Sequence, residues 1–253
     1  RKLAGDNPPE FLLTHPVTSS RISDAFNAAE RIEFSGGKRN TINFEFIKGR
    51  LKARYFSSSP QATARYFKNL YLENPTNENK YAYISSLKLN NEADLALNLI
   101  DEMLQIFPKN LILNITKSEI LLSDQRIDAA HKNINKVLNI SPKNYPASIV
   151  KSKILSAQKE TIKAEEILRE LLINKNNDPG LWLQLSEVQR AGKNIIGYHL
   201  SRGEYLMLLG DFESALNQFK FALALSNNSF QTSETIMTKI KLAQEKLGRR
   251  RGF

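Results

Sequence analysis

The sequence predicts an all-α fold in which two-helix units stack as an α-solenoid. Prolines recur at Pro75, Pro108, Pro142 and Pro179, with gaps of 33, 34 and 37 residues. Each proline is expected to close one amphipathic helix before the next begins, because proline cannot continue a helix. A helix–turn–helix unit of about 34 residues therefore repeats along most of the chain.

Helical pairs are expected from Phe44 onward. Their ranges are 44–56 with 60–73, 78–89 with 92–107, 111–123 with 126–140, and 147–157 with 162–174. In the second pair, Leu95, Leu99 and Met103 form one line at i, i+4 spacing, and Ala96 belongs to a neighbouring line. Two adjacent lines make a stripe too broad for one contact, so the helix should pack on its own partner and on the next repeat. The period is that of the tetratricopeptide repeat.

The last third of the chain contains the clearest single unit. Small and large residues alternate there, as expected where helices approach closely and aromatic rings fill the adjoining gaps. These residues are Gly203, Leu206, Gly210, Phe212, Ala215, Phe219 and Ala222. The preceding unit opens at Trp182, so a helix over 195–209 should serve as the second helix of one unit and the first of the next. A final helix over 233–247 should cap the stack with a polar outer side.

Residues 1–34 do not resemble the repeats. They read as a proline-rich loop followed by a helix over 20–33, and Ser35-Gly36-Gly37 should break that helix. We therefore divide the chain into residues 1–40, a short helical tail with a linker, residues 41–248, the repeats, and residues 249–253, a disordered basic tail. Because the chain begins with Arg1 rather than Met, we expect a fragment or a processed form.

Composition excludes several classes of function. The 253 residues include no cysteine, so a disulfide framework and a thiolate metal site are excluded. No stretch approaches the ~20 apolar residues of a membrane span. The net charge is +10, but Lys48, Arg50, Lys52 and Arg54 step by two and so scatter around a helix axis. We expect no nucleic-acid partner, although a basic nucleic-acid-binding solenoid stays open as a rival.

Catalytic motifs are missing from the sequence. The histidines are His15, His131 and His199, so the helical zinc signature H-E-x-x-H is absent. Neither a phosphate-binding loop nor a G-x-S-x-G nucleophile elbow occurs. On these grounds the chain is not a complete enzyme, and we expect no activity from it.

Residues 9–25 carry a resemblance to a known family. They read PEFLLTHPVTSSRISDA. This run is similar to a segment, P-x-(F/M)-L-x-T-H-P-x-x-x-x-R-(I/L), that closes the peptidase domain of BepA/YfgC-type periplasmic zinc metalloproteases, which are related to HtpX peptidases. The stretch 199–247 is similar to that family's ending.

The resemblance implies a tetratricopeptide domain after a zinc peptidase domain, and it makes residues 1–40 the C-terminal tail of that peptidase domain plus a linker. The zinc ligands and a signal peptide would then lie upstream of this chain, which itself would hold no cofactor. His15 would be a metal-proximal loop residue, and Arg21 would help hold that loop. The alternative reading makes His15 a loop histidine that bonds to nearby backbone. The family works in the periplasm on quality control of outer-membrane proteins, so the partners would be those clients or the β-barrel assembly machinery.

We therefore expect a binding function, with a groove lined by first-helix residues. The candidate groove residues are Tyr81, Ser85, Lys88, Thr116, Glu119 and Lys153. The alternative reading makes each of them an ordinary exposed helix position. A second alternative is a stand-alone tetratricopeptide scaffold without a protease domain, in which residues 1–34 are only a capping extension.

Overall fold

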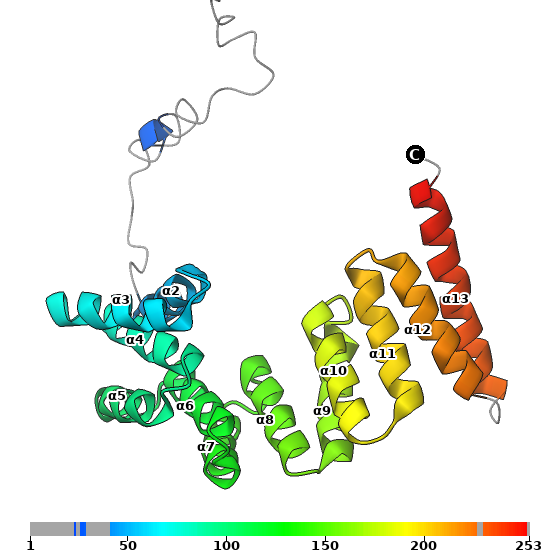
Figure 1. Cartoon of the computed structure of the whole chain (residues 1–253). Coiled ribbons are helices and arrows are strands. Elements are labelled where there is room, and N and C mark those ends of the chain that lie inside the picture. Colours follow the sequence, from blue (N-terminus) through cyan, green and yellow to red (C-terminus); the bar gives the residue numbers. More distant parts are fainter. Residues whose placement is uncertain (1–22, 24–25, 29–40, 227–229, 252–253) are drawn as a thin grey trace, which may run out of the picture. The chain divides into compact units, whose positions relative to one another are not determined.

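A computed structural model describes residues 23, 26–28, 41–226 and 230–251. The chain divides into two units, residues 1–41 and residues 42–253. In the described part of the second unit, all regular secondary structure is helical, which confirms the predicted all-α class (Figure 1). Its helices, in chain order, are α2 (Ile42–Tyr55), α3 (Pro60–Glu73), α4 (Asn77–Leu89), α5 (Ala93–Ile106), α6 (Leu111–Ser123), α7 (Ile127–Ile140), α8 (Tyr145–Ala157), α9 (Thr161–Asn174), α10 (Pro179–Ala191), α11 (Ile195–Leu208), α12 (Phe212–Leu225) and α13 (Phe230–Arg251).

Most of the expected N-terminal helix falls outside the described residues. Of the range 20–33, the structure describes residue 23 and residues 26–28, which are helical. His15 and Arg21 lie outside the described residues. Their expected roles beside a metal cleft stay predictions.

The first helices of the units start at evenly spaced positions. The N-caps of α4, α6, α8 and α10 are Thr76, Asn110, Asn144 and Asp178, one repeat period apart in every case. Each side chain accepts a hydrogen bond from a backbone N–H of the first helical turn, for example from Leu113 to Asn110. Such caps satisfy N–H groups that the helix cannot pair itself, and they fix where each unit begins.

The turn between the two helices of a unit repeats with the same period. Asn91, Gln125, Lys159 and Lys193 all have positive φ, between 60° and 65°, and each stands one repeat period after the last. In each turn the backbone N–H of the next residue donates a hydrogen bond to a carbonyl near the end of the first helix. For example, the N–H of Arg126 donates to the carbonyl of Leu121 at 2.9 Å. This left-handed ending satisfies the last carbonyls of the first helix and turns the chain back.

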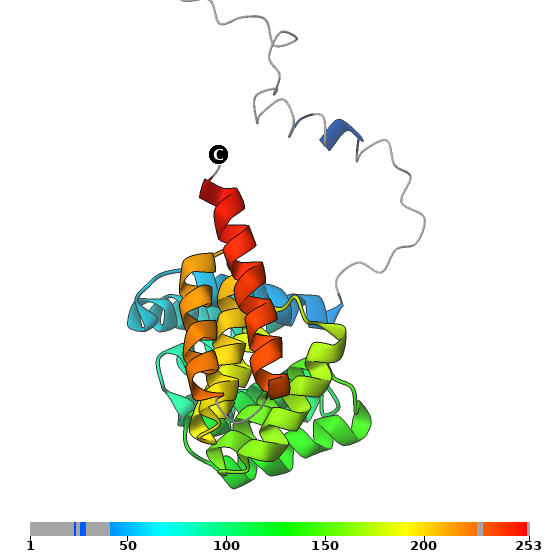
Figure 2. The same ribbon diagram turned by 90° about the vertical axis from the view of Figure 1, so that its right-hand side faces the viewer.

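Helix α11 belongs to two units, as the sequence predicted for residues 195–209. Gly210, which follows α11, has a positive φ of 77° and stands only half a repeat period after Lys193. The N–H of Asp211 donates to the carbonyl of Leu206 at 3.0 Å, as in the turns of the preceding units. The turn after α11 therefore has the form of a turn after a first helix. Helix α11 packs on both α10 and α12, and α12 packs on α13 (Figures 1 and 2).

Two expectations about segment ends need correction. Pro75, Pro108 and Pro142 lie in loops after α3, α5 and α7, but Pro179 is the first residue of α10 rather than a closing residue. Proline is well tolerated at that first position, where its missing N–H would be unpaired anyway, and this explains why the last gap between prolines is the longest. Helix α13 runs to Arg251, so residues 249–251 are helical instead of disordered.

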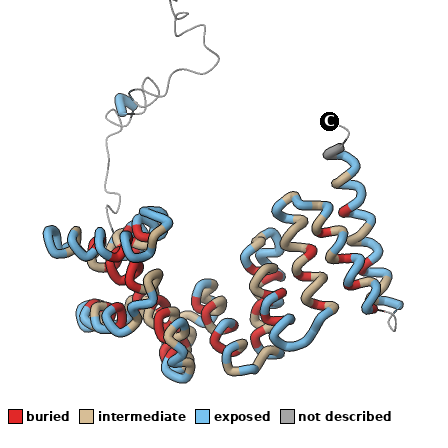
Figure 3. Tube along the Cα trace, in the orientation of Figure 1, coloured by how far each residue is buried: buried red, intermediate tan, exposed pale blue. Residues whose placement is uncertain are grey.

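Small residues mark where helices approach most closely. Ala96, Ala130 and Ala164 are fully buried and occupy equivalent places in α5, α7 and α9. Buried residues recur along the helices of the second unit (Figure 3). A Cβ added to Gly203 would lie 2.2 Å from the ring of Phe219, as the predicted alternation of small and aromatic residues requires. A Cβ on Gly49 would lie 2.5 Å from the carbonyl oxygen of Glu78, so α2 and α4 meet backbone to backbone.

Candidate partner-binding face

The first helices bring most of the candidate groove residues together. Ser85 and Lys88 come from α4, and Thr116 and Glu119 from α6. Helix α2 supplies the opposite wall of a hollow of about 300 Å³, here called the α2–α4–α6 pocket. Its lining residues are Arg50, Leu51, Arg54, Tyr55, Ser85, Lys88, Leu89, Thr116 and Glu119.

A hydrogen-bonded triad links the three helices at the base of this pocket. The Arg50 guanidinium donates to the Tyr81 hydroxyl and to Thr116 Oγ1, each at 2.6 Å. The Thr116 hydroxyl donates to the carbonyl of Ile112 at 2.9 Å, so the Tyr81 hydroxyl must donate to Thr116 across their 2.6 Å contact. Tyr81 is fully buried and Thr116 is 1% exposed. Tyr81 is therefore buried beneath the pocket, where it holds Arg50 and Thr116, and it does not line a groove.

The triad keeps Arg50 charged and fixed. Burial alone lowers the pKa of Arg50, but the neighbouring Tyr81 and Glu119 outweigh this and raise the pKa above its ordinary value. Burial raises the pKa of Tyr81, so its hydroxyl stays neutral and can donate. The Tyr81 ring packs against the ring of Phe46 in α2, with centroids 5.1 Å apart. This contact fixes the position of the Tyr81 hydroxyl beside Arg50 and Thr116.

The mouth of the pocket has more positive than negative charge. Lys88 Nζ pairs with Glu119 Oε2 at 2.5 Å, and Glu119 is the one carboxylate among the lining residues. Arg54 is exposed, and no acidic side chain among the described residues pairs with it. Arg50, Arg54 and Lys88 set against Glu119 leave a local formal charge of +2.

One polar group of the pocket has no partner. Ser85 is 7% exposed, and its hydroxyl has no hydrogen-bond partner in the structure. The next residue, Ser86, donates to the carbonyl of Tyr83 at 2.7 Å, the ordinary solution for a serine inside a helix. A buried hydroxyl without a partner costs about 1–3 kcal/mol. A ligand atom that accepts a hydrogen bond from Ser85 would remove this cost, which favours binding.

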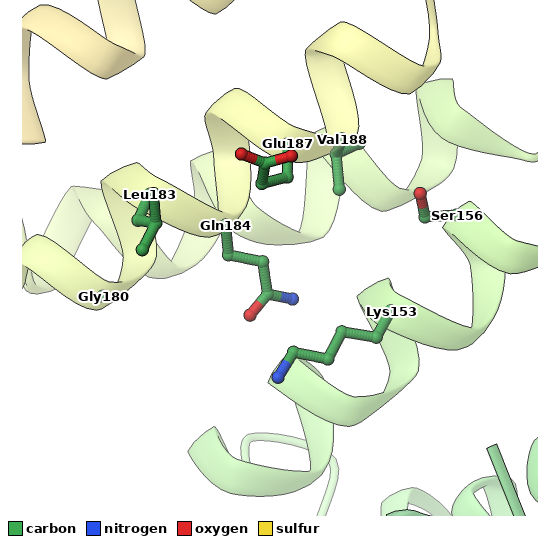
Figure 4. A pocket seen from close by; sticks show the side chains of 7 residues that line it. All are labelled: Lys153, Ser156, Gly180, Leu183, Gln184, Glu187 and Val188. Atoms are coloured by element: carbon green, nitrogen blue, oxygen red, sulfur yellow. The ribbon is translucent and has the colours of Figure 1, made fainter. Parts of the chain in front are cut away.

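Lys153 lies apart from the other candidates, in a second hollow of about 370 Å³ between α8 and α10 (Figure 4). Lys153 of α8 stands on one wall, and Gln184 of α10 extends toward it from the other (Figure 4). The Gln184 amide donates to the carbonyl of Ile149 at 3.1 Å and also to Ser152, which ties α10 to α8. The sequence placed Lys153 in one groove with the rest, but the structure describes two separate hollows.

The cations of α2 were missed as a site because the sequence showed them only as scattered charge. In the structure they form two i, i+4 pairs on different faces. Lys48 and Lys52 bind Glu78 of α4, at 2.9 and 2.5 Å, whereas Arg50 and Arg54 line the pocket. A run of cations at every second position therefore marks two helix faces, and this signal was available in the sequence.

The remaining histidines have local partners. The Lys151 amine contacts His131 Nε2, and His199 Nδ1 lies 2.8 Å from Gln218 Oε1. Across the described ranges, no group of three or more His, Cys, Asp or Glu side chains is placed to hold a metal ion. In the same ranges, none of the helices combines the length and apolar character needed to cross a membrane.

Comparisons with known proteins agree on the fold. No family model matches the chain, and no curated protein matches it in sequence. A solved tetratricopeptide-repeat protein from Thermus thermophilus is 16% identical over 79% of this chain and 99% of its own, with a TM-score of 0.50. A tetratricopeptide-repeat protein from Parabacteroides merdae is 17% identical over 87% of this chain and 90% of its own, with a TM-score of 0.49.

MamA of Desulfovibrio magneticus is 13% identical over 74% of this chain and 96% of its own, with a TM-score of 0.47. At these identities the likeness concerns the fold alone. Together with the observed helices, the Thermus thermophilus structure shows that the second unit is an all-α helical repeat domain of the tetratricopeptide kind. The comparisons give no support to a BepA-type protease or to any peptidase.

Proposed function

We propose that this chain is a protein-interaction scaffold whose first-helix face binds an extended segment of a partner polypeptide. The α2–α4–α6 pocket carries this proposal. It combines a buried hydroxyl without a partner, at Ser85, with an exposed cation that no described carboxylate neutralises, at Arg54. A repeat domain holds such groups on a rigid surface and so presents them to a ligand at little entropic cost.

The chemistry of the pocket favours binding over catalysis. No histidine is among the described residues that line it, and its one carboxylate, Glu119, is engaged by Lys88. Ser85 therefore has no adjacent base that would activate it as a nucleophile.

Peptide binding by the full chain tests the scaffold function. A library of extended peptides would be titrated by fluorescence polarisation against the wild type, Arg54→Gln and Lys136→Gln. Arg54 lies on the first-helix face, and Lys136 lines a hollow between the second helices α5 and α7 together with residues of α6. We expect binding that Arg54→Gln weakens and Lys136→Gln leaves unchanged. Loss in the Lys136 variant alone would assign the function to the hollow between α5 and α7.

The particular biological role remains a proposal that rests on residues 9–25. Their similarity to the segment that closes the peptidase domain of BepA-type enzymes supports assigning the scaffold to a periplasmic zinc metalloprotease of that kind. Its repeats would bind outer-membrane protein clients or the β-barrel assembly machinery. In that assignment the resemblance places the zinc ligands in a peptidase domain upstream of this chain.

A stand-alone tetratricopeptide scaffold is the second candidate, and it needs no upstream domain. The coding sequence upstream of Arg1 separates the two. An H-E-x-x-H motif within the preceding couple of hundred codons supports the protease assignment, and a start codon at the position before Arg1 refutes it. The chain as given should show no casein cleavage that a chelator abolishes.

A further inference from the structure

We propose that the α2–α4–α6 pocket recognises an acidic side chain of the partner, an Asp or Glu, flanked by a large apolar residue. This inference deepens the proposed function and rests on it. The observations are the charge of the pocket, the unpartnered Ser85 hydroxyl and an apolar stripe on α2.

The charge selects an anion of limited size. Arg50 is fixed at the base by Tyr81 and Thr116, and Lys88 is held at the rim by Glu119. A guanidinium carries five N–H donors in a planar fork, so Arg50 keeps donors beyond the two hydrogen bonds that it makes here. Arg54 stands one helical turn further along α2 on the same side. A carboxylate between the two arginines is the anion that such forks fit best in a protein ligand.

Ser85 supplies the neutral donor. Serines and threonines elsewhere on these helices pair with a backbone carbonyl, as Ser86 does with Tyr83 and Ser118 with Asn114 at 3.1 Å. The Ser85 hydroxyl makes no such bond, although it is more than nine-tenths buried and lines the pocket. A carboxylate oxygen that enters the pocket would accept this hydrogen bond and remove the cost of the unpaired group.

The requirement for a large apolar residue in the partner follows from helix α2. Ile47, Leu51 and Tyr55 follow one another at spacings of four residues and are 42%, 51% and 80% exposed. Leu51 and Tyr55 also line the pocket, so the apolar stripe begins at its wall. A partner residue next to the acidic one would cover this stripe while the carboxylate enters. A duplex or single-stranded nucleic acid offers phosphates without an aliphatic neighbour and fits the stripe less well.

The test compares two blocked heptapeptides that differ only in whether the central side chain ends in a carboxylate or in an amide. Both are acetylated and amidated, with Leu on each side of the central residue, which is Glu in one and Gln in the other. Blocking removes the chain-terminal carboxylate, so any preference reports the side chain. The full chain should bind the Glu peptide about 10-fold or more tightly than the Gln peptide, because hydrogen bonds to charged groups contribute about twice those to neutral ones.

Two variants place that preference in the pocket. Ser85→Ala should reduce the affinity for the Glu peptide about 5- to 30-fold and leave the stability of the chain unchanged or higher, since an unpaired hydroxyl is removed. Ser86→Ala is the matched control: its hydroxyl is bonded to the backbone and outside the pocket, so peptide affinity should not change. Arg54→Gln should abolish the preference for Glu over Gln, and Lys136→Gln, which removes the same charge elsewhere, should retain it.

Several outcomes would overturn the inference. Equal affinity for the two peptides, with both weakened by Arg54→Gln, refutes carboxylate recognition and leaves the scaffold function intact. Unchanged affinity in Ser85→Ala refutes the role of the pocket. If a fluorescent oligonucleotide binds more tightly than the Glu peptide and depends on Arg54, the site belongs to a nucleic acid. If no library peptide binds the first-helix face at all, both the inference and the scaffold function fail.

Discussion

Replacing Gly49 by alanine should loosen the packing of α2 on α4. An added Cβ would lie 2.5 Å from the carbonyl oxygen of Glu78 and 3.1 Å from the backbone nitrogen of Ala82. Ordinary van der Waals contact begins at 3.4 Å, so the overlap with the oxygen is 3.4 − 2.5 = 0.9 Å. Both neighbours are backbone atoms inside a helix, and they cannot rotate away as a side chain would.

The expected magnitude follows from two opposing terms. Overpacking of this kind costs about 1–3 kcal/mol. Alanine gains up to about 1 kcal/mol of helix propensity over glycine. Gly248 in α13 has nothing within 4 Å of its added Cβ, so Gly248→Ala carries the propensity gain alone. The free energies of unfolding of the two variants should therefore differ by about 1–3 kcal/mol, with Gly49→Ala the less stable.

Urea unfolding followed by far-UV circular dichroism measures this difference. Because stacked repeats can unfold piecewise, amide hydrogen exchange should be read helix by helix as well. Protection should fall in α2 and α4 and stay unchanged in α12. Peptide affinity should fall too, since α2 carries Arg50. If Gly49→Ala matches Gly248→Ala in stability and exchange, the close approach of α2 and α4 does not exist.

Three further predictions concern the repeats. Burial and, after it, hydrogen bonding to Asp178 raise the pKa of Tyr145 to about 12, so its stabilisation is present below the unfolded-state pKa of about 10 and is lost between pH 10 and 12. The stability difference between wild type and Tyr145→Phe should therefore shrink over that range in urea titrations, and a constant difference would contradict the assignment. Gln125→Gly should raise the unfolding free energy by about 0.5–1 kcal/mol, because φ is 60° there; a loss would argue against the left-handed turn. Ala130→Leu should cost about 1–3 kcal/mol in thermal or urea unfolding, whereas Ala129→Leu at the exposed neighbouring position should stay within about 0.5 kcal/mol.

The repeat period was predictable from the sequence, although its best markers were not the prolines. Proline is tolerated both in a loop and at the first residue of a helix, so Pro142 lies in the loop after α7 whereas Pro179 begins α10. The N-caps keep a constant period, because each must accept a hydrogen bond from the first turn of its helix. The left-handed turn residues were not predictable by type, since Gln125 and Lys193 have no preference for positive φ.

The candidate site was predicted only in part, for a physical reason that lies in α4. Helix α4 packs on α2, α3 and α5, and its residues 81–87 are all buried. A helix that is covered on nearly every side has no amphipathic pattern from which an exposed face could be predicted. Tyr81 and Ser85 both lie on the turns that face α2 and α6, yet one supports the pocket and the other lines it. That distinction depends on the Arg50 side chain, which the sequence does not place.

The net charge of +10 is therefore a poor guide to what the pocket can attract. On α2, residues two apart point to opposite sides, so Lys48 and Lys52 neutralise Glu78 and hold α2 on α4. Arg50 is committed to the base of the pocket, and Lys88 is paired with Glu119. Only one or two positive charges of the α2–α4–α6 pocket then remain available to bind a partner. A nucleic-acid surface gathers many phosphate contacts and loses affinity steeply with salt. A pocket with so few available charges should instead bind with a shallow salt dependence, because the buried Ser85 hydrogen bond and the apolar stripe of α2 are not screened.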